Sequence, residues 1–432
     1  MGKLQIFVAV LVALLISSVS SAQEEYKFDI SEIEKKPYHI GGYVEFRPAI
    51  FWMDKDAALY KLRFFNQDEG NTIEEYNGDI QLEGSYEKGI ARVFVLVNGD
   101  LTYSYQGWSD SLDLYEGTLS LKPSNSLAID LGKETQKWGK GYAWNPVAFV
   151  DRPKDPEEPD LAREGFWMAS ADYIKSFSGP LKTFSFTPVL LPVYGQVNDE
   201  FGKSDKLNVA GKFYLLLYDT DIDLMFLTGG SRTPRFGFDF SRNISTNLEV
   251  HGEFAYINNF KQKTIDERGK VSESKFDAKS YLLGMRYLTE IDTTFILEYY
   301  HNGTGYTQDE IGSFFSLIDK SYKTYLSSRN RDSLTKAQSL AGNYGGVNPM
   351  NDYLYLRVTQ KDPFNILYFT PALTSIINLD DGSFSLSPEL TYAGITNLEL
   401  RLKASANVGQ NESEYGEKPS DYRLELRARY YF

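Results

Sequence analysis

The sequence predicts an all-β protein, a transmembrane antiparallel up-and-down β-barrel of 18 strands. Apolar and polar residues alternate along most of the chain, whereas the 3.6-residue period of helices is scarce. Many alternating stretches are long enough for the roughly 9–11 tilted residues of a membrane-spanning strand. The 31 Tyr and 28 Phe crowd the ends of these stretches, as aromatic residues do in the interfacial girdles of membrane barrels.

The N-terminus has the pattern of a secretory signal peptide, predicted over residues 1–22. Lys3 precedes the apolar run Ile6 to Ile16, and Ser20 and Ala22 fit the small-residue positions of a cleavage site. This run is shorter than the roughly 20 residues of a spanning helix, although an uncleaved anchor is the alternative. We expect cleavage near Ala22, a short periplasmic segment over 23–38, and a single barrel over 39–432.

Composition excludes several classes of function. The chain has no Cys, which fits a bacterial envelope better than a eukaryotic extracellular space and excludes thiol nucleophiles and Cys-ligated metals. The formal net charge of −14 argues against a nucleic-acid partner. After residue 22 no apolar run reaches about 20 residues, so the sequence predicts no helical membrane span.

The strands follow from the alternation. In residues 396–407, Leu398, Leu400 and Leu402 alternate with Glu399, Arg401 and Lys403, so one face is apolar and the other is charged. The predicted strands lie near 39–52, 73–87, 90–106, 109–122, 125–134, 166–177, 180–191, 206–218, 221–228, 233–241, 246–257, 275–287, 292–301, 351–359, 365–378, 383–392, 396–407 and 420–432. We assign residues 57–66 to a loop; a strand there is the alternative, and a total of 16 strands stays open.

The alternation of apolar and polar residues suits a soluble sandwich as well as a barrel. The lengths of the loops favour the barrel. Short and long connections alternate, so the short turns share one end, which we expect to face the periplasm. The long loops are expected to face outward and lie near 53–72, 135–165, 192–205, 258–274, 302–350 and 408–419.

The last strand carries a specific resemblance. Leu424, Leu426 and Tyr430 alternate with polar residues before the terminal Phe432. Such a strand resembles the assembly signal of Gram-negative outer-membrane proteins, which the barrel assembly machinery reads. Together with the leader and the strand count, the mature chain resembles the outer-membrane β-barrel porin family, in particular substrate-specific porins and alginate-export-type barrels. The resemblance implies a Gram-negative outer membrane, contact with its lipid and lipopolysaccharide, no cofactor and no metal.

Residues 135–165 resemble the loop that folds inward and narrows the pore of porin-like barrels. The segment combines glycines, prolines, tryptophans and charges; a solvated surface loop is the alternative. The constriction candidates are Lys137, Trp138, Lys140, Tyr142, Trp144, Arg152, Lys154, Asp155 and Arg163. In the loop 302–350, residues 309–325 and 332–341 have helical spacing, which predicts a helical cap, either a gating lid or a structural hood.

Strand parity places charged residues on the inner wall. The lumen candidates are Arg423, Glu425, Arg427, Arg429, Glu399, Arg401, Lys403, Arg286 and Arg357. Residues of mixed sign form a bracing lattice of salt bridges in one interpretation and contact a passing solute in the other. The arginines of the last strand are the best candidates for contact with an anion or carboxylate.

We therefore predict a passive or substrate-selective channel for small charged solutes, without enzymatic activity. Export of an anionic polysaccharide and a sleeve for electron-carrying proteins are the alternatives. A lipase on the outer wall would need a hydroxyl nucleophile beside His301, and no G-x-S-x-G motif is present. The sequence leaves monomer and trimer open.

Overall fold

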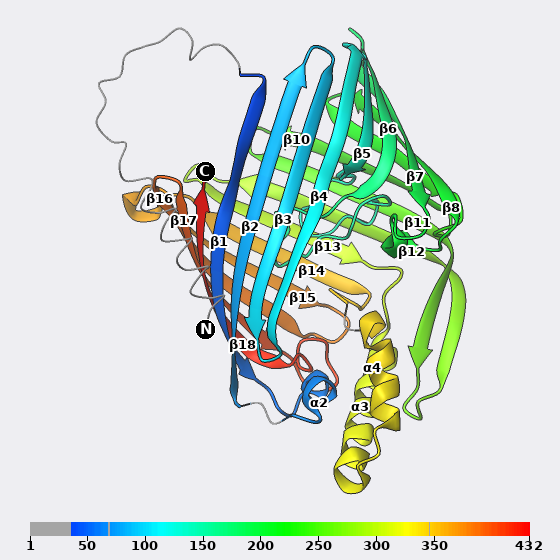
Figure 1. The fold of residues 1–432 in the computed structure, drawn as a ribbon, viewed down its shortest axis with the longest axis vertical. Helices are drawn as coiled ribbons and strands as arrows, with labels where there is room; N and C mark the ends of the chain where they lie inside the picture. Colours follow the sequence, from blue (N-terminus) through cyan, green and yellow to red (C-terminus); the bar gives the residue numbers. More distant parts are fainter. Residues whose placement is uncertain (1–35, 68–69, 345) are drawn as a thin grey trace.

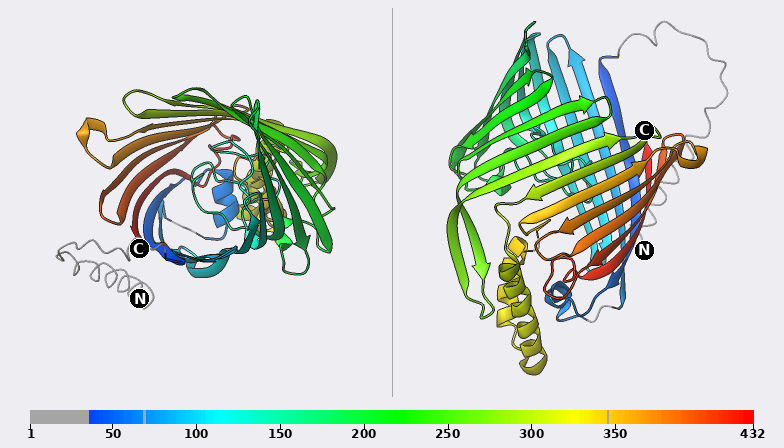
Figure 2. Two further views of the ribbon diagram at one scale, coloured as in Figure 1. Left: turned by 90° about the horizontal axis from the view of Figure 1, so that it is seen from above. Right: turned by 180° about the vertical axis from the view of Figure 1, so that it is seen from behind.

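All 18 predicted strands are present, and they close into one antiparallel barrel (Figures 1 and 2). This computed structural model describes residues 36–67, 70–344 and 346–432. The predicted signal peptide and most of the segment 23–38 lie outside the described residues. Each strand pairs with the next, and β1 also pairs with β18, so the sheet has no open end. The 16-strand alternative is wrong.

The strands agree with the predicted ranges except at their ends. They are β1 (Tyr38–Met53), β2 (Thr72–Lys88), β3 (Ala91–Ser104), β4 (Gly107–Ser124), β5 (Leu127–Glu134), β6 (Phe166–Ser176), β7 (Leu181–Val193), β8 (Lys206–Leu217), β9 (Thr220–Thr228), β10 (Arg235–Ser245), β11 (Leu248–Ile265), β12 (Val271–Leu288), β13 (Thr293–His301), β14 (Asp352–Gln360), β15 (Phe369–Asn378), β16 (Phe384–Ile395), β17 (Leu398–Val408) and β18 (Ser420–Tyr431). Short turns join the strands at one end of the barrel, the short-turn end, and the longer loops lie at the other, the long-loop end.

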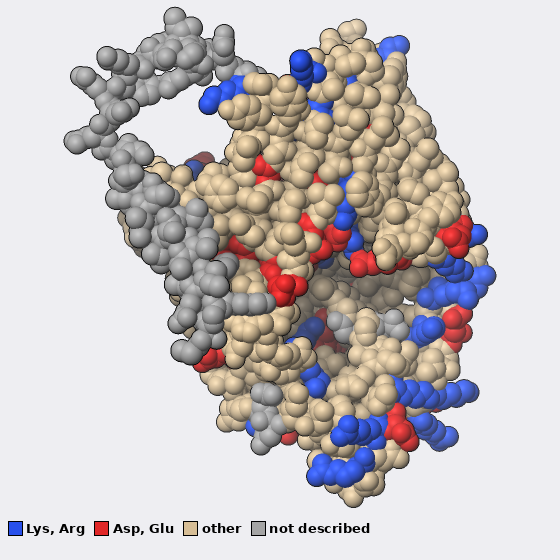
Figure 3. Space-filling view, in the orientation of Figure 1, with Lys and Arg blue, Asp and Glu red and all other residues tan. Residues whose placement is uncertain are grey.

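The two faces of the wall differ in the way the alternation predicts. On β17, Leu402 is 41% exposed, whereas its neighbour Arg401 is 5% exposed. On β10, Phe238 is 43% exposed on the outer face, and Asp239 is fully buried on the inner face. Over the upper strands of Figure 3 the outer surface is largely uncharged, and charged groups gather toward the end that carries the helices. An apolar outer face around a polar interior is the arrangement of a transmembrane barrel.

The last residue of the chain lies at the closing seam of the barrel. The Phe432 N–H donates to the Gly42 carbonyl at 3.1 Å, and the Gly42 N–H donates to the Phe432 carbonyl at 3.2 Å. Leu424 and Leu426 of β18 are 40% and 50% exposed on the outer face. The N–H and carbonyl groups of Gly42 and Phe432 are thus all paired across the seam, as membrane-embedded backbone requires.

Two loop predictions differ from the structure. The predicted loop 258–274 is mostly strand, because β11 and β12 extend to Ile265 and Val271 as a paired hairpin. In residues 258–274 both faces of the hairpin carry polar side chains, so the alternation of apolar and polar residues is weak in this stretch. Residues 57–66 are neither irregular loop nor strand, since they hold the helix α2 (Ala58–Phe64). Leu62 of α2 is buried against the other helices, a long-range contact that a short window of sequence does not reveal.

The predicted helical cap is confirmed at the long-loop end. It consists of α3 (Gln308–Ser328) and α4 (Asp332–Tyr344), and α3 begins with a capping box between Thr307 and Glu310. The helices pack with α2 in one apolar cluster that covers this end (Figure 1). Two short 3-10 helices, η2 (Asp199–Phe201) and η3 (Pro363–Asn365), complete the fold. In the described ranges, none of the helices has the length and apolar content to cross a bilayer.

Candidate functional site: the lumen and its inner segment

Residues 135–165, here called the inner segment, leave the wall after β5 and return at β6. Figure 2 shows loop segments inside the ring of strands, and hydrogen bonds tie the inner segment to wall residues as distant in sequence as Glu253, Glu298 and Arg401. The segment therefore lies in the lumen, bonded to the wall strands β11, β13 and β17.

Glu253 of β11 holds the first part of the inner segment. Its carboxylate Oε1 accepts the N–H groups of Lys140 and Gly141, each at 2.6 Å, and the side-chain amide of Asn145 at 2.9 Å. A Cβ on Gly141 would lie 2.1 Å from the Trp144 carbonyl oxygen, so only glycine allows this turn. Converging backbone N–H groups are a known cradle for anions, and here the anion is a wall carboxylate.

Glu298 of β13 repeats this arrangement one step further along the segment. Its carboxylate accepts the N–H groups of Tyr142 and Ala143, the latter at 2.9 Å, and it also contacts His251 Nε2 at 2.8 Å. Glu253 and Glu298 are 3% and 0% exposed. Charged hydrogen bonds of this kind are roughly twice as strong as neutral ones, so the two glutamates fix the backbone of residues 140–143.

Glu158 ties a later part of the inner segment to β17, four strands along the wall from β13. Its carboxylate accepts from the Arg401 guanidinium at 2.7 Å and from Lys403 Nζ at 3.1 Å. Burial raises the pKa of Glu158, but the hydrogen bond from Arg401 and the charges of Lys403 and Arg401 outweigh it and lower the pKa to about 2. The carboxylate is therefore ionised, and the salt bridges persist, at any ordinary pH.

The two tryptophans of the inner segment are buried anchors. Trp138 is 1% exposed in an apolar cluster with Val147 and Phe149. Trp144 stacks on Tyr300 of the wall with ring centroids 5.1 Å apart, and its indole N–H donates to Asn348 at 3.1 Å. Their side chains therefore stabilise the segment and present little surface to the lumen.

Several of the predicted constriction charges are used within the protein. Lys140 Nζ lies 2.9 Å from Asp223, and Arg152 contacts Glu164 at 2.8 Å and also Glu200. Asp155 accepts the Glu157 N–H at 2.9 Å, a local turn bond. These interactions make the three side chains part of the scaffold of the segment.

Other predicted charges line open space. Lys137, Lys154 and Arg163 face a cavity of about 930 Å³, the first cavity, where Arg286 of β12 joins them. Lys154 Nζ donates to the carbonyls of Gly141 and Tyr142 at 2.7 and 3.1 Å. Burial and then the charge of Arg163 lower the pKa of Lys154. In residues 36–67, 70–344 and 346–432, none of these four cations has a carboxylate within salt-bridge distance.

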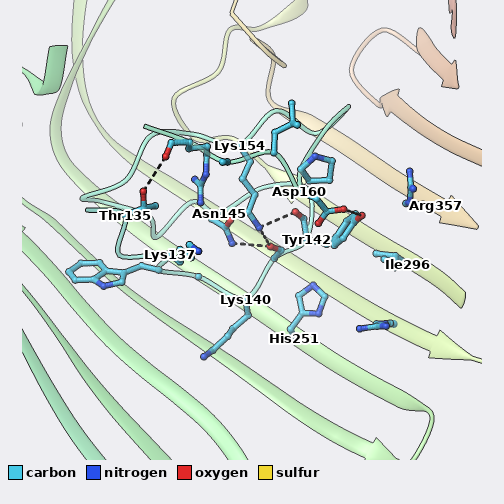
Figure 4. Close-up of a pocket in the computed structure, with 18 of the residues that line it drawn as sticks. Thr135, Lys137, Lys140, Tyr142, Asn145, Lys154, Asp160, His251, Ile296 and Arg357 are labelled. Atoms are coloured by element: carbon cyan, nitrogen blue, oxygen red, sulfur yellow. Dashed lines mark hydrogen bonds between the residues drawn. The ribbon is translucent and has the colours of Figure 1, made fainter. Parts of the chain in front are cut away.

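A second cavity of about 780 Å³ lies beside the first, and both are lined by Tyr142, residues 159–161 and Arg357. The Tyr142 hydroxyl donates to Asp160 at 3.0 Å across the inner segment. Figure 4 shows Tyr142, Lys154 and Asp160 on the segment, with His251 and Arg357 on the wall strands. Tyr142, Asp160 and Arg357 thus mark the boundary between the two cavities.

The predicted lumen wall is largely a lattice of ion pairs. Arg427 contacts Glu399, and Arg429 contacts Glu45 at 2.6 Å. Arg357 reaches Glu389 at 3.4 Å. Arg423 and Arg401 both contact Glu425, the second at 2.9 Å. Each arginine of the last strand therefore has a carboxylate partner, and the bracing interpretation describes them better than a free anion contact.

Strand parity puts Glu253 and Glu298 on the inner wall, but it does not identify them as anchors of the inner segment. The signal that points to them is the pair of glycines, Gly139 and Gly141, in a stretch whose backbone N–H groups have no strand partner. On the outer wall, His301 Nδ1 lies 2.9 Å from Asp352, and its ring stacks on Tyr281. Among the described residues, no serine or threonine hydroxyl is bonded to His301.

Comparison with known proteins agrees with the barrel geometry. No family model matches the sequence, and no curated protein matches it. Among solved structures, OccK11 (OpdR) of Pseudomonas aeruginosa is similar with a TM-score of 0.50 and 12% identity over 91% of this chain and 96% of that chain. The fold is that of an outer-membrane porin.

Two further structures from the same organism align over a similar length. The outer-membrane protein OprD has a TM-score of 0.49 and 9% identity over 91% of this chain and 94% of its own. OccK2 (OpdF), solved in complex with glucuronate, has a TM-score of 0.49 and 12% identity over 91% of this chain and 98% of its own.

Proposed function

We propose that this protein is an outer-membrane channel for the substrate-selective diffusion of small charged solutes, with a preference for anions. The first cavity is the observation that supports this most. Six cations and four carboxylates line it: Lys137, Lys140, Lys154, Arg163, Arg286 and Arg357 against Glu83, Glu116, Glu249 and Asp160. Among the described residues, Lys137, Lys154, Arg163 and Arg286 have no carboxylate within salt-bridge distance, and the excess of cations over carboxylates would give a passing solute a positive potential.

The inner segment would act as the constriction of this channel. Its anchoring at Glu253 of β11, Glu298 of β13 and Arg401 of β17 would hold it in the lumen. A small solute would pass beside Tyr142 and Asp160 at the boundary between the two cavities. Because the constriction is held by fixed hydrogen bonds, we expect the channel to select solutes by size and charge without energy input.

The proposal includes the placement in the envelope. We infer secretion by a signal peptide cleaved near Ala22 and insertion through the terminal strand with Phe432, Tyr430, Leu426 and Leu424. The short-turn end would face the periplasm, and the end capped by α2, α3 and α4 would face outward. Lipid and lipopolysaccharide would surround the wall, and a monomer and a homo-oligomer both fit this placement.

Two of the rival functions find less support. A sleeve for an electron-carrying protein would need a wide lumen, and the inner segment occupies that space. A lipase would need a hydroxyl nucleophile at His301, whose bonds go to Asp352 and whose ring contacts Tyr281. Export of an anionic polysaccharide remains the second candidate, because the cationic lining of the first cavity suits it equally.

Planar-bilayer recording of the purified, refolded protein tests the proposal. A salt gradient should give a single-channel current whose reversal potential has the sign of anion preference. An added anionic polysaccharide should not thread the pore and should leave that current unblocked. Absence of conductance would reject the channel, a cation-selective reversal potential would reject the anion preference, and a polysaccharide block would favour export.

A further inference from the structure

Two aspartates face each other across neighbouring strands behind the inner segment. Asp239 of β10 is the register partner of Asp223 on β9 and of Glu253 on β11, so three carboxyl groups form a row on the inner face of the wall. Asp239, Asp223 and Glu253 are 0%, 2% and 3% exposed. Like charges directly opposite one another destabilise a sheet, and buried carboxylates are unfavourable unless donors compensate them. The row therefore needs positive charge or a proton.

Donors reach two of the three carboxyl groups. Glu253 accepts three backbone N–H groups and one side-chain amide of the inner segment, at 2.6 to 3.4 Å. Asp223 lies 2.9 Å from the ammonium of Lys140, which extends from the inner segment toward the wall strands (Figure 4). Within residues 36–67, 70–344 and 346–432, no N–H or O–H group donates to either oxygen of Asp239. Asp239 is thus the uncompensated member of the row.

The group that faces Asp239 is itself an acceptor. The side chains of Asp239 and Asp223 lie within hydrogen-bond reach of each other, and Asp223 Oδ1 has no donor in the described part of the chain. Two carboxyl groups make such a contact when one of them holds a proton, as the aspartate pair of aspartic proteases does. A metal ion is the other way to compensate the charge, but the described ranges contain no group of three Asp, Glu or His side chains placed to hold one.

We propose that Asp223 and Asp239 share one proton at neutral pH, so that the pair carries a single negative charge, which the ammonium of Lys140 balances. Because Asp223 contacts the ammonium, the proton belongs on Asp239. The pair then holds Lys140, and with it the inner segment, without adding net charge to the lumen. Loss of the proton in alkaline solution would add one negative charge behind Lys140, beside the first cavity. Its effect on selectivity rests on the proposed channel function, whereas the shared proton does not.

Other titratable and charged groups surround the pair. They are Lys140 of the inner segment, Asp221 of β9, Tyr214 and Lys212 of β8, Glu253 and His251 of β11, and Arg235 of β10. Asp221 offers the matched control, because it lies two residues from Asp223 on the same face of β9 and its carboxylate accepts the Tyr214 hydroxyl. A carboxylate with such a donor is expected to be ionised.

Infrared difference spectroscopy of the refolded barrel at neutral pH tests the shared proton, because a protonated carboxyl has a C=O stretch separate from the carboxylate bands. Asp239→Asn keeps a donor toward Asp223 and removes the proton, so one protonated-carboxyl band should be lost. Asp223→Asn is the second variant and should lose the same band, since its amide would donate to an ionised Asp239. Asp221→Asn should keep the band. All three variants should show the heat-modifiable gel migration of a folded barrel.

Reversal potentials test the consequence for selectivity. In alkaline solution the anion preference of the unmodified channel should fall by more than that of Asp239→Asn, which has no proton to lose at this position. The difference between the two proteins isolates the pair from the lysines of the first cavity, which both proteins keep.

The outcomes separate the shared proton from its rivals. Identical infrared spectra of the unmodified protein and Asp239→Asn would overturn the proposal and leave Asp239 ionised. A band that disappears when calcium chloride is added would also overturn it, since a cation then occupies the row. An equal alkaline fall of anion preference in both proteins would overturn the role in selectivity alone. Absence of conductance would reject the channel and leave the infrared result standing, so the two failures are distinguishable.

Discussion

Replacing Glu253 with alanine should release the inner segment from the wall. The carboxylate accepts three bonds of 2.9 Å or shorter, from the Lys140 and Gly141 N–H groups and from Asn145. A buried donor left without its acceptor costs about 1–3 kcal/mol, so three of them destabilise the anchored segment by roughly 3–9 kcal/mol. Water that enters the lumen can satisfy the freed N–H groups and moves the cost toward the lower end of that range.

The assay for this prediction is single-channel conductance together with limited proteolysis of the folded barrel. Glu253→Ala should show higher and noisier conductance, and cleavage within residues 135–165 should appear. Glu83→Ala is the matched control, since Glu83 lines the same cavity but is bonded to His39 and not to the inner segment. If both variants conduct alike and both resist cleavage, the carboxylate does not anchor the segment and the reasoning fails.

Three further predictions address selectivity, pH and assembly. Arg286→Glu should reduce or reverse the anion preference measured by reversal potential, because it places a negative charge in the first cavity, whereas Lys122→Glu on the exposed short-turn end should change it little. The pKa of the Glu158 carboxyl in the folded protein is lowered to about 2, below the ordinary glutamate pKa of roughly 4.3. The salt bridge of Glu158 to Arg401 therefore contributes fully to anchoring above about pH 4.3, and this contribution is lost as the pH falls through the folded pKa. Conductance should therefore stay constant from neutral pH to about 4 and rise only near 2, and a step near the ordinary glutamate pKa would contradict the salt bridge to Arg401. Deletion of Phe432 removes two backbone bonds at the seam with β1 and should lower the amount of heat-modifiable barrel in the membrane, while Phe432→Tyr should keep it; equal amounts would show that the seam does not need this residue.

The barrel was predictable from the sequence because each strand carries its own signal. Leu398, Leu400 and Leu402 face lipid and their neighbours face the lumen, and this two-residue period needs no knowledge of the partner strand. The prediction failed where that signal is absent. The hairpin of β11 and β12 extends beyond the apolar band, and α2 is held by contacts with α3 that are remote in sequence.

The site was predictable in its residues but not in their pairing. The Arg401 guanidinium is bonded to Glu158, which is 243 positions away, and Arg429 is bonded to Glu45 at a separation of 384. Parity gives the face on which a charge lies, while its partner depends on the closure of the whole barrel. For this reason strand parity leaves both a bracing lattice and a solute contact open for Arg423, Arg427 and Arg429, and in the structure each of them contacts a carboxylate.

The most direct test of the central claim compares the conductance of the protein with that of a variant lacking residues 138–160. Both should migrate as heat-modifiable barrels, which confirms that the wall is intact. The account predicts that the variant conducts more and discriminates less between anions and cations. Unchanged conductance and unchanged selectivity would contradict the claim that the inner segment is the constriction of the channel.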